Sequence, residues 1–295
     1  MRDPSEFLTE VEPTWCPGCG NYNMSKALRT ALARSGLDFH EFAVVFGIGC
    51  HGNGADFLRC QAFHALHGRS LPVAAGIALT HPELRVIVEV GDGDGYGLGL
   101  GHFVHACRRN VDMTFIAHNN QIYGLTTGQA SPTSDHLMPS VSTPHGVLEW
   151  PVNPVGLAIA QGATFVARGF AGDVEHLTVL YEQAMAHKGF AVVDVFQPCV
   201  TWNKVNTFKW FRERVYRLEE ADHDPSDKGA AFALSLSTFH ELTCSPDECR
   251  IPIGVFYSSE GEPTYQDGLP QLEGPMWRAA LKPRDVSETL GRFGV

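Results

Sequence analysis

Four short apolar runs stand out along the chain, because none of them alternates with polar residues. They cover residues 42–46, 85–90, 113–118 and 191–196. A strand that is buried on both faces of a sheet needs no polar alternation, so these runs predict the strands of a parallel sheet.

Stretches with apolar residues at helical spacing separate those runs. They cover residues 24–34, 72–79, 98–109, 154–162 and 174–187. Strands that alternate with helices predict an α/β fold, in which helices cover both faces of a parallel sheet.

Two stretches depart from this alternation. Residues 119–152 are rich in Gly, Ser, Thr and Pro, and so long a loop in a compact domain is usually functional or disordered. From residue 201 onward the alternation fades, and charged, proline and aromatic residues become frequent. The sequence therefore predicts one α/β domain over residues 1–200 and an irregular C-terminal extension over residues 201–295.

Candidate ligand groups follow all four predicted strands. Cys50, Asp92, the pair Asn119 and Asn120, and Cys199 each lie within a few residues of a strand's end. Parallel strands end at the same edge of a sheet, and such folds bind their ligands there. We therefore expect these side chains to share one crevice.

The segment after the second strand, residues 91–95, is Gly-Asp-Gly-Asp-Gly. Its glycines let backbone N–H groups approach phosphate oxygens, and the next helix offers its positive N-terminus. The G-x-G-x-x-G pattern of dinucleotide-binding folds fits in no register. With Asn119 and Asn120, the segment instead has the spacing of thiamine-diphosphate enzymes, where carboxylate and amide oxygens bind Mg²⁺ beside the diphosphate. The alternative is that the two asparagines form an ordinary turn.

The cysteines offer a second metal site. Residues 16–19 form a C-x-x-C motif, which is compatible with zinc, redox chemistry or an iron–sulfur cluster. Two more ligands are needed. Cys50 and Cys199 share the predicted edge and favour a cluster, whereas Cys244 and Cys249 would complete a structural zinc site. Composition alone does not separate these two sets.

Composition narrows the classes of function. The formal net charge is −11, which argues against a nucleic-acid partner. The chain has no signal-peptide pattern and no apolar stretch long enough to span a membrane, so we expect a cytoplasmic protein without membrane contact. In that compartment the eight cysteines are expected to be thiols or metal ligands rather than disulfides.

Longer motifs carry a family resemblance. The stretches WCPGCGN, GIGC, HGRSLPVAAGI, GDGDGYGLGLGHFVHACRRN and NNQIYGLTTGQASPT follow one another in this order. Together they resemble the β subunit of 2-oxoacid:ferredoxin oxidoreductases, especially of the 2-oxoglutarate type. The resemblance covers residues 12 to 210 and is weaker beyond them.

The resemblance implies ligands for three cofactors. One [4Fe–4S] cluster would be held by Cys16, Cys19, Cys50 and Cys199. Mg²⁺ would be held by Asp92, Asn120 and the carbonyl group of Ile122. Thiamine diphosphate would lie against Ile48, Gly49, Cys50, His51, Gly93, Asp94, Gly124 and Leu125.

The chain departs from the family's motifs near the expected substrate site. After GIGC the family continues with Ser-Gly and then Arg or Lys, whereas this chain has His51 and Asn53 there; Thr127 replaces a lysine of the loop. Other groups must therefore contact the substrate carboxylates. We expect His51, Arg69 or residues of a second subunit to do so, and His51 and Arg69 are the candidate catalytic residues.

The family's reaction interconverts 2-oxoglutarate, coenzyme A and oxidised ferredoxin with succinyl-CoA, CO₂ and reduced ferredoxin, so the reverse direction fixes CO₂. It implies an α subunit that completes the active site, in an (αβ)₂ assembly. One alternative is the same chemistry on pyruvate or on a broad range of 2-oxoacids. Others are a thiamine enzyme with a structural zinc, and a metal-stabilised interaction module without catalysis.

Overall fold

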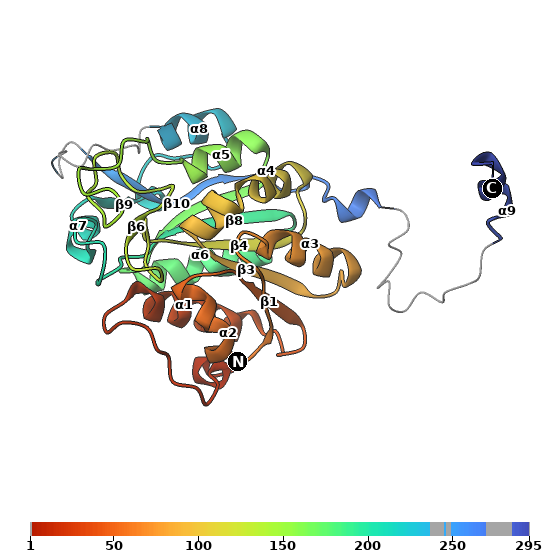
Figure 1. Ribbon diagram of the computed structural model, residues 1–295, viewed down its shortest axis with the longest axis horizontal. Coiled ribbons are helices and arrows are strands. Elements are labelled where there is room, and N and C mark those ends of the chain that lie inside the picture. The colour runs from red at the N-terminus through yellow and green to blue at the C-terminus, as the bar shows by residue number, and fades with distance from the viewer. Residues whose placement is uncertain (1, 237–244, 246–248, 270–284, 295) are drawn as a thin grey trace.

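The computed structural model describes residues 2–236, 245, 249–269 and 285–294, and an eight-stranded sheet forms its centre (Figure 1). The strands of this sheet lie in the order β2-β1-β3-β4-β8-β7-β10-β9, and a two-stranded hairpin pairs β5 with β6. All neighbours in the large sheet are parallel except β7 and β10. The predicted α/β fold with a parallel sheet is thus confirmed.

The strands are β1 (Phe42–Phe46), β2 (Gln61–His64), β3 (Arg85–Gly91), β4 (Met113–Asn119), β5 (Ile122–Tyr123), β6 (Gln129–Ala130), β7 (Phe165–Phe170), β8 (Phe190–Phe196), β9 (Val215–Arg217) and β10 (Ile251–Ser258). The α-helices are α1 (Gly20–Ser35), α2 (Gly54–Phe57), α3 (Ser70–Thr80), α4 (Leu100–Arg109), α5 (Pro154–Gln161), α6 (Val174–Ala186), α7 (Phe208–Arg212), α8 (Lys228–Leu236) and α9 (Ser287–Arg292). Short 3₁₀ turns cover Pro4–Phe7, Cys50–Asn53, Leu218–Glu220 and Gln266–Gly268, and a π-helical turn covers Gly93–Leu98.

The four predicted strands are present as β1, β3, β4 and β8, which lie side by side in the sheet. Every residue of β1, β4 and β8 is buried, as the missing polar alternation indicates. Helices α1 and α6 pack on one face, and α3, α4, α5 and α8 lie over the other (Figure 1). Two apolar cores therefore enclose the sheet.

Helix α1 begins earlier than its apolar spacing predicts. It starts at Gly20, and Cys19 is its N-cap residue with an extended backbone. The C-x-x-C motif therefore ends where the helix begins, and one N–H group of the first turn, that of Asn21, lies at the Cys19 sulfur.

Three strands of the large sheet were hard to predict because their sequences lack a continuous apolar run. Arg168 interrupts β7, Pro252 and Gly254 interrupt β10, and β2 is an exposed edge strand. Strands β9 and β10 extend the sheet with residues beyond position 200. The boundary between residues 1–200 and 201–295 stays a prediction.

No helix in the described ranges is long and apolar enough to cross a membrane.

Candidate functional site

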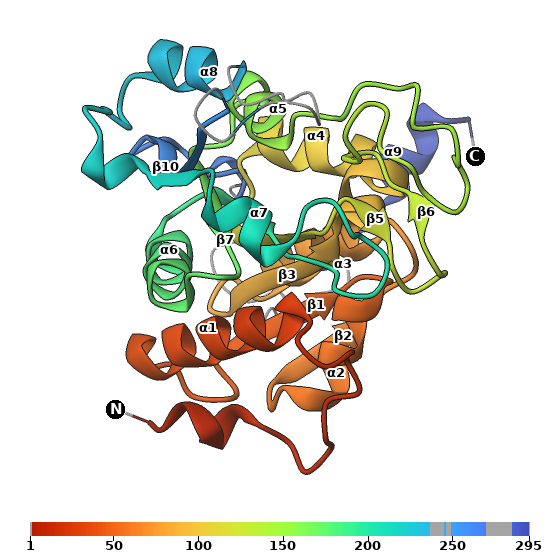
Figure 2. The same cartoon turned by 90° about the vertical axis from the view of Figure 1, so that its left-hand side faces the viewer.

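A cleft lies where β1, β3, β4 and β8 end, and residues of β5 form part of its wall. Figure 2 shows β5 and β6, the two strands of the hairpin. Most residues that we predicted to bind a cofactor line the cleft: Ile48, Gly49, Cys50, His51, Asp92, Gly93, Asp94, Asn120, Ile122, Gly124 and Leu125. The carboxyl edge of the sheet therefore brings together side chains from segments that lie far apart in the sequence.

Asp92 is buried at the end of β3, and two hydroxyl groups hold one of its carboxylate oxygens. Ser131 donates a hydrogen bond to Oδ2, and the Thr133 hydroxyl lies 2.6 Å from the same atom. Burial raises the pKa of Asp92 to about 6, although these hydrogen bonds oppose the rise. A carboxylate that is held in this way is a suitable ligand for a cation.

A buried polar network continues from Asp92 into the sheet. The Thr133 hydroxyl also lies 2.9 Å from Asn119 Oδ1, and the Asn119 amide donates to the carboxylate of Asp194. Tyr96 and Arg168 contact Asp194 from two other sides. The network fixes Asp92 and the end of β4 relative to each other.

Asn120 and Ile122 are joined by a residue with a left-handed backbone. Gln121 has a φ of 59°, and its side chain donates to the carbonyl of Thr133 and to Asp135. The Asn120 side chain accepts a hydrogen bond from the Ile122 N–H. This turn keeps Asn120 and Ile122 on the wall of the cleft, where an amide oxygen and a backbone carbonyl could face a cation.

The glycine-rich segment needs its glycines for close approach. A Cβ atom on Gly93 would lie 2.1 Å from the Tyr123 ring, and one on Gly47 would lie 1.8 Å from the Asp94 carboxylate. Asp94 in turn binds His67 at 2.6 Å and the Gly68 N–H at 2.7 Å. Asp94 therefore attaches the turn before α3 to the cleft.

His51 lies in the cleft wall and is almost fully buried. Its ring packs against His118 with a centroid separation of 5.2 Å, and its Nε2 atom has no hydrogen-bond partner among the described residues. Burial lowers the pKa of His51 well below its usual value, and neighbouring histidines lower it further. A neutral imidazole with an unpartnered nitrogen fits a site that is completed by a bound cofactor.

Four cysteines from three segments of the chain, Cys16, Cys19, Cys50 and Cys199, lie near one another beside the cleft. A Cβ atom on Gly124 would lie 3.6 Å from the sulfur of Cys199 and 3.8 Å from that of Cys50. Burial raises the pKa of Cys19 to about 11, and charges on Cys199, Cys50 and Cys16 would raise it further. These thiols could therefore share one multi-iron cluster, whose cysteine ligands lie farther apart than those of a single metal ion.

The rival zinc site is not supported. Cys249 is disulfide-bonded, so it is not available as a thiolate ligand, and the expectation that no cysteine forms a disulfide was wrong. Cys244 lies outside the described residues. Within the described part of the chain, no group of three His, Cys, Asp or Glu side chains is arranged around a single metal ion. A tetrahedral zinc would require its thiolates to lie within ~4 Å of one another.

Arg69 lies outside the residues that line the cleft. Its side chain is exposed, and its guanidinium lies 2.6 Å from Nε2 of His102. Its assignment as a catalytic residue stays a prediction.

The cleft also contains residues that we did not predict from the sequence. They are His67, Gly91, His118, Tyr123, Thr126 and Gln197. His67, Tyr123 and Thr126 lie within the motifs that carry the family resemblance, which is the signal that could have found them. His118 and Gln197 lie at the ends of β4 and β8, next to predicted ligands. Their place in the cleft can be inferred only when the ends of these strands are known.

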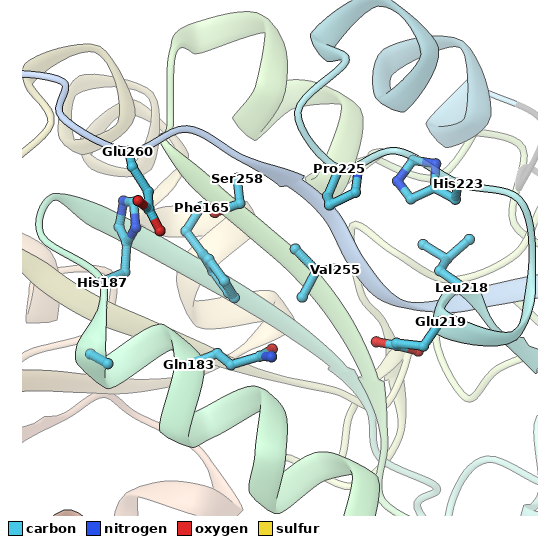
Figure 3. Close-up of a pocket in the computed structure, with 11 residues that line it drawn as sticks. Phe165, Gln183, His187, Leu218, Glu219, His223, Pro225, Val255, Ser258 and Glu260 are labelled. Carbon is cyan, nitrogen blue, oxygen red and sulfur yellow. The ribbon is translucent and has the colours of Figure 1, made fainter.

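A second hollow lies between α6, β7 and β10 (Figure 3). Three of its titratable side chains are already engaged with the protein. His187 contacts Thr164 at 2.7 Å, His223 contacts the carbonyl of Phe256 at 2.8 Å, and Glu219 pairs with His176. The chemistry is therefore better sought at the carboxyl edge.

Asp135 is a buried carboxylic acid in the loop of residues 119–152, and its titration can be used to test how this loop packs. Burial raises its pKa from 3.8 to about 6, although Asn206 and Gln121 donate hydrogen bonds to it. The native protein therefore binds its proton more tightly than the unfolded chain, and the contribution of Asp135 to stability falls as the pH rises from 4 to 6. We expect Asp135→Asn to remove this pH-dependent loss of stability, which amounts to roughly 3 kcal/mol of unfolding free energy.

The measurement is urea unfolding of wild type and Asp135→Asn across this pH range. The variant should gain stability relative to wild type as the pH rises. Two parallel pH profiles would show that folding does not raise the pKa of Asp135.

Comparisons with known proteins agree with this geometry. Residues 24–195 match the family described as "Thiamine pyrophosphate enzyme, C-terminal TPP binding domain". Residues 199–274 match the family model for the C-terminal part of the pyruvate ferredoxin oxidoreductase beta subunit. The cleft described above therefore lies within a thiamine-diphosphate-binding domain.

Individual relatives cover most of the chain. The β subunit of a 2-oxoacid:ferredoxin oxidoreductase from Sulfolobus sp. is 45% identical over 86% of this chain and 85% of its own. The 2-oxoglutarate oxidoreductase subunit KorB of Mycobacterium tuberculosis is 41% identical over 90% of this chain and 73% of its own.

A solved structure is similar along almost the whole length. It is the 2-oxoglutarate:ferredoxin oxidoreductase from Magnetococcus marinus with 2-oxoglutarate, coenzyme A and succinyl-CoA bound. It aligns with a TM-score of 0.87 at 37% identity, over 99% of this chain and 96% of that chain. Sequence motifs, fold and relatives agree, and the chain belongs to the family of 2-oxoacid:ferredoxin oxidoreductase β subunits.

Proposed function

We propose that this chain, together with an α subunit, oxidises 2-oxoglutarate to succinyl-CoA and CO₂ and passes the electrons to ferredoxin through a [4Fe–4S] cluster. The observation that carries the proposal is the convergence of four cysteines on the cleft that Asp92 and Asn120 line. A thiamine site alone would not require thiols there. The same residues would serve the reverse, CO₂-fixing direction.

In the proposed site, Asp92, Asn120 and the Ile122 carbonyl would hold Mg²⁺, which would neutralise charge of the cofactor's diphosphate. Bound thiamine diphosphate supplies the electron sink for decarboxylation of a 2-oxoacid. The chain fixes the cofactor's position, since Ser131 and Thr133 hold Asp92 and the glycines admit the diphosphate. The buried walls exclude water from the reacting groups.

The exposure of the cysteines supports a route for electrons. Cys199 is buried, Cys19 and Cys50 are half-buried, and Cys16 is exposed. A cluster held by these four residues would extend from the wall of the cleft to the protein surface. A soluble carrier such as ferredoxin could therefore approach it from the side of Cys16.

An α subunit is implied by the name of the family, and the surface supports it. Large apolar side chains are exposed around the cleft: Leu66, Leu98, Leu125, Val141 and Trp202. Leu125 is part of the cleft wall, while Val141 and Trp202 both lie against Gly128 of the hairpin loop. Apolar groups gathered at the mouth of a site are typical of a protein contact.

Two observations bear on the identity of the substrate, and they point in different directions. Relatives named for 2-oxoglutarate support this substrate. However, no lysine or arginine is among the described residues that line the cleft. This observation favours a second candidate, the same reaction on pyruvate or a broad range of 2-oxoacids, unless the second carboxylate is bound by His51 or by residues of the α subunit.

The test is co-expression with the α subunit, followed by coenzyme-A-dependent reduction of ferredoxin or viologen. We expect kcat/KM for 2-oxoglutarate to exceed that for pyruvate and branched-chain 2-oxoacids by at least about tenfold. Equal values for all substrates would reject the preference for 2-oxoglutarate. A colourless, iron-free complex would reject the cluster.

A further inference from the structure

Gln197 lies between the two proposed metal sites and contacts a residue of each. It follows β8 directly, and its side chain is buried. Its carbonyl oxygen Oε1 accepts a hydrogen bond from Asn120 Nδ2 at 3.3 Å. Its amide nitrogen Nε2 donates to Cys19 Sγ at 3.3 Å and to the carbonyl of Pro198 at 3.3 Å. Every polar atom of the side chain is therefore used.

We propose that Gln197 is a positioning residue that tunes the redox centre and the magnesium site together, by donating a hydrogen bond to the Cys19 sulfur and by fixing the Asn120 amide. This inference rests on the proposed function, because it needs a cluster at Cys19 and a cation at Asn120. Gln197 was not among the residues predicted from the sequence.

The contact with Cys19 bears on the reduction potential. Reduction adds negative charge to a cluster and its thiolates, so an N–H group that points at a sulfur stabilises the reduced state. Hydrogen bonds to the sulfurs are one of the ways in which proteins set these potentials. The Asn21 backbone N–H also lies at this sulfur, and Gln197 supplies the contact that comes from a side chain.

The contact with Asn120 fixes the orientation of its amide together with the Ile122 N–H, which donates to Asn120 Oδ1 at 3.1 Å. Because Gln197 presents an oxygen, Asn120 turns its nitrogen towards Gln197 and keeps its Oδ1 free of that contact. An amide oxygen is the atom that Mg²⁺ prefers. Residues that orient a metal ligand in this way change metal affinity by about 10–100-fold when they are replaced.

The first turn of α1 leaves room for this side chain. A Cβ atom on Gly20 would lie 2.8 Å from Gln197 Cγ and 3.1 Å from its Nε2. The glycine therefore lets the amide reach the sulfur. The placement of Gln197 thus depends on both the motif at residues 16–20 and the end of β8.

The variant to test is Gln197→Met in the co-expressed complex, because methionine is similar in length and lacks the amide donor and acceptor. The midpoint potential of the cluster is measured by a redox titration followed by electron paramagnetic resonance. We expect the equilibrium constant for reduction to fall about tenfold, which is 59 mV for one electron. The apparent affinity for Mg²⁺, measured in thiamine-diphosphate binding, should fall at least about tenfold.

The control is Gln129→Met in β6, where the glutamine side chain contacts Thr126. It should leave the potential and the Mg²⁺ affinity as in wild type. Gln197→Leu is the second variant if the methionine variant is unstable, and the same two shifts are expected.

An unchanged potential in a Gln197 variant that carries a full cluster would overturn the inference. So would an unchanged Mg²⁺ affinity. Loss of the cluster from both variants with wild-type thermal unfolding would also overturn it, because a hydrogen bond that tunes a potential is not needed for assembly. Absence of iron from the wild-type complex would instead reject the proposed function.

Discussion

Cys199→Ser should remove the iron–sulfur cluster from the complex and abolish the reduction of ferredoxin. Cys199 is buried and packs with Ile122 and Met138, so its sulfur is held against the wall of the cleft. Serine has the same shape, and therefore the fold should persist. Its hydroxyl does not replace a thiolate as a ligand of iron, so the cluster loses one of its four attachments.

The measurement is iron content and visible absorbance of the purified complex. We expect the brown colour and nearly all the iron to be lost, with the unfolding temperature of the chain lowered only modestly. Cys60→Ser is the control, because Cys60 is likewise a free cysteine, here half-buried, and lies outside the predicted set. A coloured Cys199→Ser complex with full iron would remove Cys199 from the ligands.

Asp92→Asn should weaken thiamine-diphosphate binding in the presence of Mg²⁺ by at least about a hundredfold. Replacement of residues that only orient a metal ligand costs about 10–100-fold, and loss of the charged ligand itself should cost more. Asparagine keeps the shape of the side chain. The hydroxyl groups of Ser131 and Thr133 remain beside it, so a large structural change is not expected.

The measurement is calorimetric titration of the co-expressed complex with thiamine diphosphate and Mg²⁺. The iron content should stay that of wild type, which separates this site from the cluster. The control is Asp112→Asn. Asp112 directly precedes β4 and so lies at the edge of the sheet away from the cleft, and this variant should bind the cofactor normally. Normal affinity in Asp92→Asn would show that the cation is held elsewhere.

The four central strands of the sheet could be predicted because each is a short, mostly apolar run. Strands β1, β3, β4 and β8 are mostly apolar and do not alternate with polar residues, and a strand buried on both faces has that pattern. Strand β7 could not be found in this way, because Arg168 and Gly169 together break its apolar run; the charge of Arg168 is compensated by Asp194 of the neighbouring strand. Such a pair is visible only after the two strands are aligned.

The meeting of Cys50, Asp92 and Asn120 was also predictable, because each of these candidate ligands follows a parallel strand and the strands β1, β3 and β4 end at the same edge. Cys50, Asp92 and Asn120 line the same cleft for this reason. The groups that hold these ligands were not predictable. Thr133 and Gln197 act through hydrogen bonds to residues far away in the sequence, and no local pattern identifies those partners.

The placement of the cluster relative to the cofactor tests the account most directly. The measurement is a crystal structure of the co-expressed complex with thiamine diphosphate and Mg²⁺, with anomalous scattering recorded at the iron absorption edge. We predict one iron peak enclosed by Cys16, Cys19, Cys50 and Cys199, next to Gly124 and a diphosphate bound at Asp92. Iron bound away from these cysteines, or a diphosphate bound outside this cleft, would contradict the account.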